Sequence, residues 1–238
     1  GCDLLRLDKA DLVVAGAFDD VGLEGLRGFG DMNATIPAST RAERGLEPGA
    51  ASRPFDMRRG GFVEAQGGGT VLLCRADLAL ELGLPVHGLI GGAWSCGDGL
   101  QRSVPAPGPG LLSIAAGGMI SPLGRALSQV GLGADDIGVV SLHGTSTDAN
   151  DTNESALHAN LAKALGRTAG NPLPVIAQKA VTGHSKGGAA AWQLIGLLQA
   201  MAARTVPPMR NLDDPDPRVL AEPLVYSDRP VSAALRAG

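Results

Sequence analysis

The sequence predicts an α/β fold in which a parallel-type sheet is covered by helices on both faces. Three observations lead to this prediction. From about residue 121 the chain alternates between helical and strand-like segments, which is typical of parallel sheets. Hydrophobic residues make up 44% of the 238 residues but aromatic residues only 3%, so Ala, Val, Leu and Ile must fill the core. The 35 glycines are interleaved with apolar runs, which fits tight turns and close packing better than disorder.

The first third of the chain is expected to hold a helix end, a strand and a long loop. Residues 1–7 resemble the last turns of a helix, and residues 11–18 form an apolar run that fits a strand buried on both faces. An amphipathic stretch with Leu23 and Leu26 on one side follows. Residues 33–60 are polar, rich in Pro, Gly and Arg, and without a period, so we expect a long loop with a functional or edge role.

The remaining segments are expected to alternate between strands and helices, with glycine and proline at their ends. Gly83 ends a helix, and the prolines of residues 103–110 stiffen a loop. The apolar segment 187–203 is shorter than the roughly 20 residues of a membrane span, so we expect a buried core helix. In chain order the expected elements are a glycine turn at 67–69, a strand at 70–74, a helix at 76–82, a strand at 85–94, a helix from 121, a strand ending at 142, a helix at 151–165, a strand at 173–177 and a helix from 187.

Composition argues against several classes of function. The formal net charge is -4 and no sustained basic stretch exists, so a nucleic-acid surface has no electrostatic support, and no membrane segment is expected. Cys2, Cys74 and Cys96 are odd in number and lack the C-x-x-C spacing, which argues against a disulfide framework and a thiolate zinc site. A reducing cytoplasm is the simplest compartment. The chain has no initiator Met and no signal segment, and both ends look cut from a longer polypeptide.

Two histidines on glycine-rich turns are the first candidate site. His143 follows the apolar run 137–140, and His184 follows the run 173–177, so each is expected to close a buried strand. Side chains at strand ends of an α/β sheet converge on one crevice. Two imidazoles in one pocket can each donate an N–H to a single developing oxyanion, and this geometry needs their ring nitrogens within about 6 Å of each other.

The same turn also contains the sequence pattern of a serine hydrolase. Residues 183–187 satisfy the G-x-S-x-G pattern between a strand and a helix, with Ser185 at the nucleophile position. In that fold the catalytic histidine follows the serine along the chain. The four histidines are at positions 87, 143, 158 and 184, so none does, and the chain order argues against this class.

A metal site and a phosphate loop are also disfavoured. His143, Asp148 and Asp151 lack the paired-histidine spacing of helical zinc sites, so we expect no metal. The glycines at 183–188 lack the spacing of a Walker loop.

Longer motifs extend over nearly the whole chain. They are His-Gly-Thr-Ser-Thr at 143–147, Lys179 with His184 five residues on, Arg-Pro-Phe-Asp-Met-Arg-Arg-Gly-Gly-Phe-Val-Glu-Ala-Gln-Gly-Gly-Gly at 53–69, Gly-Ala-Phe-Asp-Asp at 16–20, Thr-Asp-Ala-Asn-Asp at 147–151 with Glu154, and Gly-Gly-Ala-Ala-Ala-Trp at 187–192. Together they resemble the β-ketoacyl synthase domain of the condensing enzymes, in the wording of multifunctional type I fatty acid synthases of the bacterial and fungal sort.

The resemblance implies a thiolase-like fold, in which two similar α/β halves stack as alternating layers of helix and sheet. Residues 1–82 would be the end of the first half and residues 83–238 most of the second, so the fold would be partial. The implied activity is that of a 3-oxoacyl-[acyl-carrier-protein] synthase within a fatty acid synthase. Its partners would be acyl carrier protein and other synthase domains, in a homo-oligomer, and this domain would bind no cofactor, because phosphopantetheine of the carrier protein holds the substrates.

The resemblance also implies roles for single residues. His143 and His184 would stabilise the enolate left when malonyl thioester loses carbon dioxide. Lys179 would keep a histidine neutral, because a cation beside an imidazole disfavours imidazolium. Asp151 and Glu154 match acidic positions near that lysine, and a buried ammonium needs such a partner.

Two of these assignments have alternatives, and one position departs from the family pattern. Asp151 could be a helix N-cap as readily as a lysine partner. Thr145 and Thr147 could either contact the phosphopantetheine arm or only turn the backbone. Gln193 stands where many stand-alone ketosynthases carry glutamate, so the resemblance implies a different charge among the groups that support the histidines.

The family's nucleophilic cysteine has no counterpart here. Cys2 would lie about three turns too late along the helix that the nucleophile begins. Cys74 is expected in a strand and Cys96 in a loop, and neither position lowers a thiol pKa. The nucleophile is therefore expected outside this chain, as is the family's C-terminal Gly-Phe-Gly segment. The alternatives are a polyketide synthase module, a thiolase, or a non-catalytic scaffold with the same fold.

Overall fold

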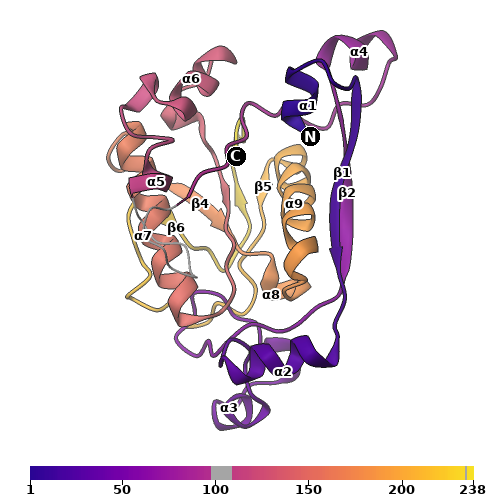
Figure 1. Ribbon diagram of the computed structural model, residues 1–238. Helices are drawn as coiled ribbons and strands as arrows, with labels where there is room; N and C mark the ends of the chain where they lie inside the picture. Colours follow the sequence, from indigo (N-terminus) through magenta and orange to yellow (C-terminus); the bar gives the residue numbers. More distant parts are fainter. Residues whose placement is uncertain (98–108, 234) are drawn as a thin grey trace.

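A computed structural model describes residues 1–97, 109–233 and 235–238 (Figure 1). Part of the proline-rich loop expected at 103–110 lies outside these residues. The elements follow one another as α1 (Cys2–Arg6), β1 (Leu12–Asp19), α2 (Leu23–Asp31), α3 (Ala38–Glu43), η1 (Pro48–Ala50), β2 (Gly67–Cys74), α4 (Ala76–Glu81), α5 (Pro109–Leu112), η2 (Gly118–Ile120), α6 (Pro122–Gln129), η3 (Ala134–Asp136), β3 (Val140–Ser141), α7 (Asp148–Leu165), β4 (Leu173–Ile176), α8 (Lys179–Thr182), η4 (Lys186–Gly188), α9 (Ala189–Ala203), β5 (Thr205–Val206), β6 (Leu224–Val225) and β7 (Val231–Ser232).

A small parallel sheet lies at the centre, as the sequence predicts. Its order is β3-β4-β6, and both neighbouring pairs are parallel. Helix α7 covers one face and α9 the other, so that the two helices flank β4 in Figure 1. The carboxyl ends of β3 and β4 therefore open at one edge of the sheet, between two helices.

Alternating side chains of β4 supply the two cores beside this sheet. Val175 packs with Ala162 of α7, whereas Ile176 packs with Ala200 of α9. Full burial of an aliphatic side chain contributes about 1.5–3 kcal/mol. The short strands thus pack against an apolar layer on each face. This packing on both sides holds the ends of the strands in fixed positions.

Strands β1 and β2 form an antiparallel ribbon, and the expectation of a strand buried on both faces is wrong. Helix α9, with η4 and α1, packs against the ribbon, and on its open side Phe18 is 81% exposed and Val14 is 67% exposed. From Leu12 to Phe18 no side chain is polar, so nothing in the run marks which face is open. The predicted amphipathic helix is present as α2, but Leu23 and Leu26 on it are exposed as well.

The glycines at 67–69 lie inside β2 and do not form the expected turn. They pair with Asp19 to Ala17 of β1. A Cβ on Gly68 would lie 2.4 Å from the carbonyl oxygen of Ala17, and one on Gly69 would lie 3.1 Å from the methyl group of Ala191. The missing side chains let the ribbon approach α9 closely.

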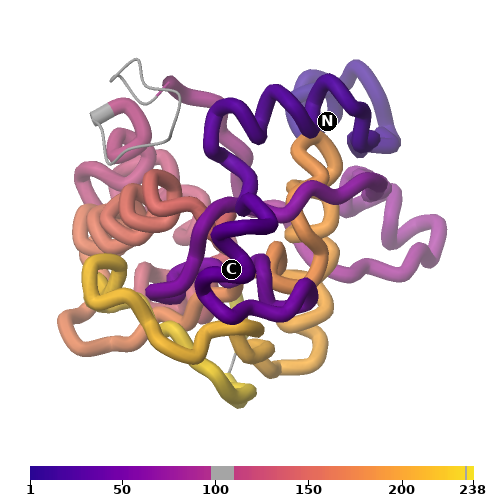
Figure 2. The backbone as a smooth tube through the Cα atoms, turned by 90° about the horizontal axis from the view of Figure 1, so that it is seen from below, coloured from indigo at the N-terminus to yellow at the C-terminus, as the bar shows by residue number. Residues whose placement is uncertain are grey.

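Four further expectations need correction. Residues 85–94 form no strand, and Leu89 on this segment is 73% exposed, because no described strand pairs with them. Residues 33–60 hold α3 and η1 and cross the end of the molecule seen in Figure 2. Helix α7 begins at Asp148, three residues before its predicted start, and α9 is mostly half-buried instead of buried.

Among the described residues, no helix is both long and apolar enough to cross a membrane. Within the same part of the chain, no group of three or more metal-ligating side chains gathers. Cys2, Cys74 and Cys96 are free thiols.

Candidate active site

The structure brings His143 and His184 together. Their ring centroids are 4.9 Å apart and the rings meet edge to face, at an interplanar angle of 81°. His143 follows β3, and His184 follows β4 and the single turn of α8. Because β3 and β4 are parallel neighbours, their carboxyl ends meet at one edge of the sheet, which is how residues distant in sequence share a site.

Hydrogen bonds define the tautomer of each ring. The Nδ1 atom of His143 lies 3.2 Å from the Lys179 ammonium, which has only donors, so this Nδ1 is an acceptor. The Nδ1 atom of His184 accepts the backbone N–H of Lys186 at 3.1 Å. A neutral ring whose Nδ1 accepts carries its proton on Nε2. No described residue bonds to either Nε2, so both N–H groups can serve a bound ligand.

Both imidazoles are held neutral. Burial, followed by the charges of Lys179 and Lys186, lowers the pKa of His184 to about 3. Partial loss of solvation and the Lys179 charge also lower the pKa of His143, although its side chain still reaches solvent. At neutral pH each ring therefore presents one donor and one acceptor.

Lys179 is buried, with only 1% of its surface exposed. Its Nζ donates to the Nδ1 and the carbonyl oxygen of His143 and to the Oε1 of Gln193, which lies 2.9 Å away. The amide nitrogen of Gln193 in turn donates to the carbonyl oxygen of Leu142. Burial lowers the pKa of Lys179 to about 8, against the opposing charges of Glu154 and Asp151. The ammonium is thus held by three neutral groups.

Glu154 acts on Lys179 through its negative charge, which opposes the lowering of the lysine pKa, but among the described residues no hydrogen bond joins the two side chains. Its two carboxylate oxygens accept the backbone N–H groups of His143 and Gly144. Burial would raise the pKa of Glu154, but bonds from His158 and from these N–H groups hold it below its usual value. The carboxylate acts on the turn that carries His143, and it affects Lys179 only through its charge.

Asp151 is neither an N-cap nor a direct lysine partner. The cap of α7 is Thr147, whose hydroxyl accepts the N–H of Asn150. The carboxylate of Asp151 accepts the N–H of Phe55 at 2.8 Å and that of Thr145 at 3.1 Å. Burial raises the pKa of Asp151 to about 6, and the bond from Phe55 opposes the rise.

Thr145 and Thr147 stabilise the turn itself. Their hydroxyls lie 2.9 Å apart and share a hydrogen bond, and Thr145 is 5% exposed. These contacts favour the turn-forming role, and contact with a phosphopantetheine arm stays a prediction.

A buried ionic network below this turn was not identified as part of the site from the sequence. Arg53 pairs with Asp56 at 2.8 Å, and Arg59 pairs with Asp216 at 2.7 Å; all four side chains are 2% exposed or less. Arg59 also lies 3.8 Å from Asp151. Residues 53–59 are unusually rich in Arg and Asp, which could have indicated this network. A charged run in a loop usually faces solvent, so the sequence alone favoured an exposed segment.

Gly144 shows why the turn needs a glycine. Its φ is +47°, and a Cβ would lie 2.8 Å from the methyl group of Ala177 and 3.3 Å from the ring of Phe55. The turn therefore rests directly on the segment that follows β4, and this contact helps to place His143 beside His184.

Ser185 has none of the surroundings of a hydrolase nucleophile. It is 0% exposed, and its Oγ has no hydrogen-bond partner among the described residues. The adjacent His184 uses Nδ1 to accept from Lys186 and not from the serine. The structure thus agrees with the chain order in disfavouring a hydrolase.

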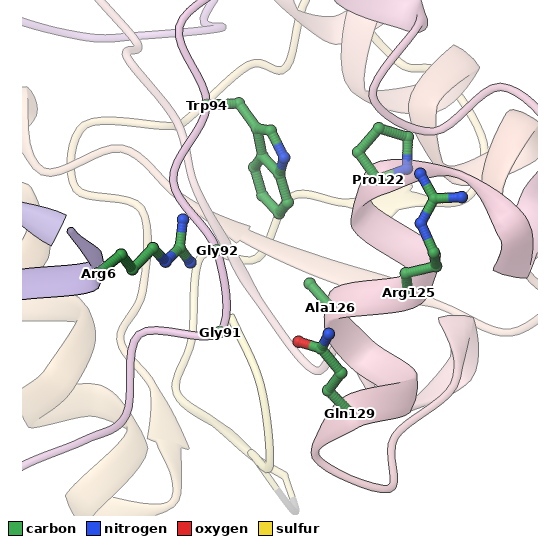
Figure 3. A pocket seen from close by; sticks show the side chains of 8 residues that line it. All are labelled: Arg6, Gly91, Gly92, Trp94, Pro122, Arg125, Ala126 and Gln129. Atoms are coloured by element: carbon green, nitrogen blue, oxygen red, sulfur yellow. The ribbon is translucent and has the colours of Figure 1, made fainter. Parts of the chain in front are cut away.

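A separate pocket lies away from the histidines. It has a volume of about 330 Å³ and is lined by residues that include Arg6, Trp94 and Arg125 (Figure 3). None of the residues that line it contacts His143 or His184, so it is not part of the histidine site.

Comparisons with known proteins agree with the fold. Residues 95–213 match the family described as Beta-ketoacyl synthase, C-terminal domain. The chain is 48% identical over 215 residues to the fatty acid synthase alpha subunit stcJ of Emericella nidulans, covering 90% of this chain and 14% of that protein. It is 43% identical over 253 residues to the fatty acid synthase alpha subunit hexA of Dothistroma septosporum, covering 94% of this chain and 15% of that protein. The chain therefore spans only a small part of these relatives.

Solved structures give the same result. The ketosynthase FabY from P. aeruginosa superimposes with a TM-score of 0.79 at 30% identity, covering 96% of this chain and 36% of that one. A β-ketoacyl synthase from Burkholderia phymatum gives a TM-score of 0.73 at 27% identity, covering 98% of this chain and 51% of that one. The layered α/β fold is that of the thiolase-like condensing enzymes, and the chain belongs to the β-ketoacyl synthase family.

Proposed function

We propose that this chain carries the decarboxylation half of a β-ketoacyl synthase site in a fatty acid synthase. The observation that carries the proposal is the pair of neutral imidazoles, His143 and His184, each with its Nε2–H available and with centroids 4.9 Å apart. Two fixed N–H donors on neighbouring rings suit an oxyanion that develops during a reaction.

The proposed step breaks the bond between the carboxylate and the α-carbon of a malonyl thioester. Carbon dioxide leaves, and the bonding electron pair moves through the α-carbon onto the thioester oxygen, which becomes an enolate oxyanion. The Nε2–H groups of His143 and His184 stabilise this charge without transferring a proton. The α-carbon then attacks an acyl thioester, and the thiolate that held the acyl group leaves.

Lys179 supports this step through His143. Its ammonium donates to Nδ1, which keeps the proton of the ring on Nε2 and disfavours imidazolium. Gln193 holds the ammonium in place through its Oε1. The proposed chemistry needs no bound metal or cofactor in this domain.

The acyl-carrying thiol is proposed to come from outside the residues of this chain. Among the described residues, no hydrogen bond joins any of its three free cysteines to His143 or His184. We further propose that acyl carrier protein presents the malonyl unit and that other synthase domains are neighbours in a homo-oligomeric assembly. The proposed location is the cytoplasm. The proposed boundary between the two thiolase-like halves lies near Gly83.

The test is release of labelled carbon dioxide from malonyl thioester of acyl carrier protein by the full-length protein. We expect release that does not require condensation and depends on both histidines. A thiolase would instead join two acetyl thioesters without releasing carbon dioxide, and a non-catalytic scaffold would do neither. Either of those results would contradict the proposal.

Replacing Gln193 by glutamate is expected to move the alkaline limit of decarboxylation to higher pH. A carboxylate in contact with the Lys179 ammonium stabilises its charged form, so its pKa should rise from about 8 by about one unit or more. The measurement is a pH–rate profile of carbon dioxide release. Gln199→Glu is the matched control, because Gln199 is exposed on the same helix.

Protein unfolding would not account for such an alkaline limit. The pKa of Lys179 is lower in the folded chain than its unfolded value, so the unfolded state binds more protons between about pH 8 and pH 10. The contribution of this residue to the free energy of unfolding therefore rises as pH rises through that window. An unchanged rate profile in Gln193→Glu would show that Lys179 does not control the step.

A further inference from the structure

Lys186 adopts a backbone conformation that is unfavourable for a residue with a Cβ atom. Its φ is +44°, in the left-handed region. In this conformation its N–H donates to the Nδ1 of His184, and the chain continues into η4. A residue kept in such a conformation beside a site is held there by its surroundings.

The side chain of Lys186 supplies an anchor. Its Nζ pairs with the Oε2 of Glu64, and it lies 5.4 Å from the centroid of the Phe29 ring. The Lys186 side chain is 22% exposed and that of Glu64 only 7%. A pair this shielded from solvent is screened much less than a surface ion pair.

Glu64 lies on the segment that pairs directly with the backbone of His184. The N–H of His184 donates to the carbonyl oxygen of Val63 at 2.8 Å, and the N–H of Ala65 donates to the carbonyl oxygen of His184 at 3.2 Å. The ion pair with Lys186 therefore closes a loop of contacts around His184. One side of the loop is backbone pairing, and the other is the side chain and N–H of Lys186.

The Glu64 carboxylate depends on this lysine. Its second oxygen, Oε1, is buried and has no hydrogen-bond partner among the described residues. Lys186 is thus the group that compensates the charge of Glu64, and the two side chains constrain each other.

We propose that Glu64 and Lys186 are a positioning pair, which holds the N–H of Lys186 on the Nδ1 of His184 and so keeps the Nε2–H of that ring directed to the space shared with His143. This inference deepens the proposed function and rests on it. The pair acts on the substrate only through His184. The inference gives Glu64 and Lys186 a role, whereas the enolate chemistry itself uses neither side chain.

The test uses hydrogen–deuterium exchange at the C2 carbon of His184, followed by mass spectrometry of the full-length protein. The pH midpoint of this exchange reports the ionisation of one histidine and needs no enzymatic activity. The variants are Glu64→Met, Lys186→Met and Lys186→Gly. The matched controls are Glu43→Gln and Lys163→Met, since both of these residues are exposed.

Glu64→Met separates positioning from charge. Removing a negative charge near His184 would by itself lower the exchange midpoint, whereas loss of the N–H bond to Nδ1 raises it. We expect an upward shift of about one pH unit or more in both methionine variants. The charged groups that remain around His184 are Lys179 and Asp19, and the variants change neither.

Lys186→Gly separates the backbone from the side chain. Glycine adopts a positive φ freely, so this variant can keep the N–H bond without the anchor. We expect a smaller upward shift than in Lys186→Met, together with a smaller loss of carbon dioxide release. A lowered or unchanged midpoint in Glu64→Met, or equal shifts in the two Lys186 variants, would overturn the inference. Absence of carbon dioxide release from the wild type would contradict the proposed function. The exchange midpoints would still show whether Glu64 and Lys186 position His184.

Discussion

Replacing His184 by alanine in the full-length protein is expected to slow malonyl decarboxylation by about 10² to 10³-fold, the usual effect of removing one oxyanion donor. Acyl loading should stay close to the wild-type rate, because it involves the thiol and not the enolate. The two reactions can be followed separately, as release of labelled carbon dioxide and as covalent attachment of a labelled acyl group.

Two further variants make the result specific to His184. His87→Ala is the matched control, because His87 is exposed on the segment after α4. His184→Gln retains an N–H donor on a side chain of similar length, so it should recover part of the lost rate. The ring of His184 also packs against Phe62 at a centroid distance of 5.0 Å, so the thermal midpoint of each variant must be recorded. Equal losses of loading and decarboxylation would assign His184 a structural role.

The parallel sheet and the meeting of the two histidines could be inferred from the sequence. His143 closely follows one apolar run, His184 follows another after the single turn of α8, and parallel strands place their carboxyl ends at one edge. This argument needs only the type of each element and not its exact limits. It held although β3 contains only two residues, Val140 and Ser141.

The edges of the molecule could not be inferred in the same way. Residues 12–18 are all apolar, so their pattern cannot distinguish a strand covered on both faces from one covered on a single face. Which face is covered depends on α9, more than 150 residues away in sequence. The glycines at 67–69 have the composition of a turn, but in β2 they serve the close approach of that helix.

The partners of the buried charges were also beyond sequence reasoning. Lys179 was expected to have a carboxylate nearby, and the charges of Glu154 and Asp151 do act on it. Its hydrogen bonds, however, go to His143 and to the neutral amide of Gln193. Asp151 and Glu154 instead bind backbone N–H groups of the nearby turn at 143–145. A carboxylate at the start of a helix has such donors within reach, and spacing alone does not reveal which acceptor the lysine will find.

Glu154→Gln tests this assignment and is expected to lower the free energy of unfolding by about 2 kcal/mol or more at neutral pH. In the wild type one carboxylate oxygen accepts the N–H of His143 and the other accepts that of Gly144. An amide has one oxygen, so its NH₂ group must face one of these donors. The strained turn also carries His143, so decarboxylation should fall as well.

The pH dependence gives the decisive comparison. The folded chain holds the pKa of Glu154 below its usual value, so its contribution to stability is present above the unfolded pKa of about 4.3 and is lost as pH falls through the folded pKa. The difference in urea midpoint between wild type and Glu154→Gln should therefore be largest near pH 7 and shrink in acid. In acid the wild-type carboxyl is protonated, so its O–H, like the amide NH₂ of the variant, must face one of the two backbone N–H groups. Glu81→Gln, exposed on α4, should show no difference at any pH. If Glu154 were instead mainly the counter-ion of Lys179, the difference in urea midpoint would also shrink in alkali, as Lys179 loses its charge above its pKa of about 8.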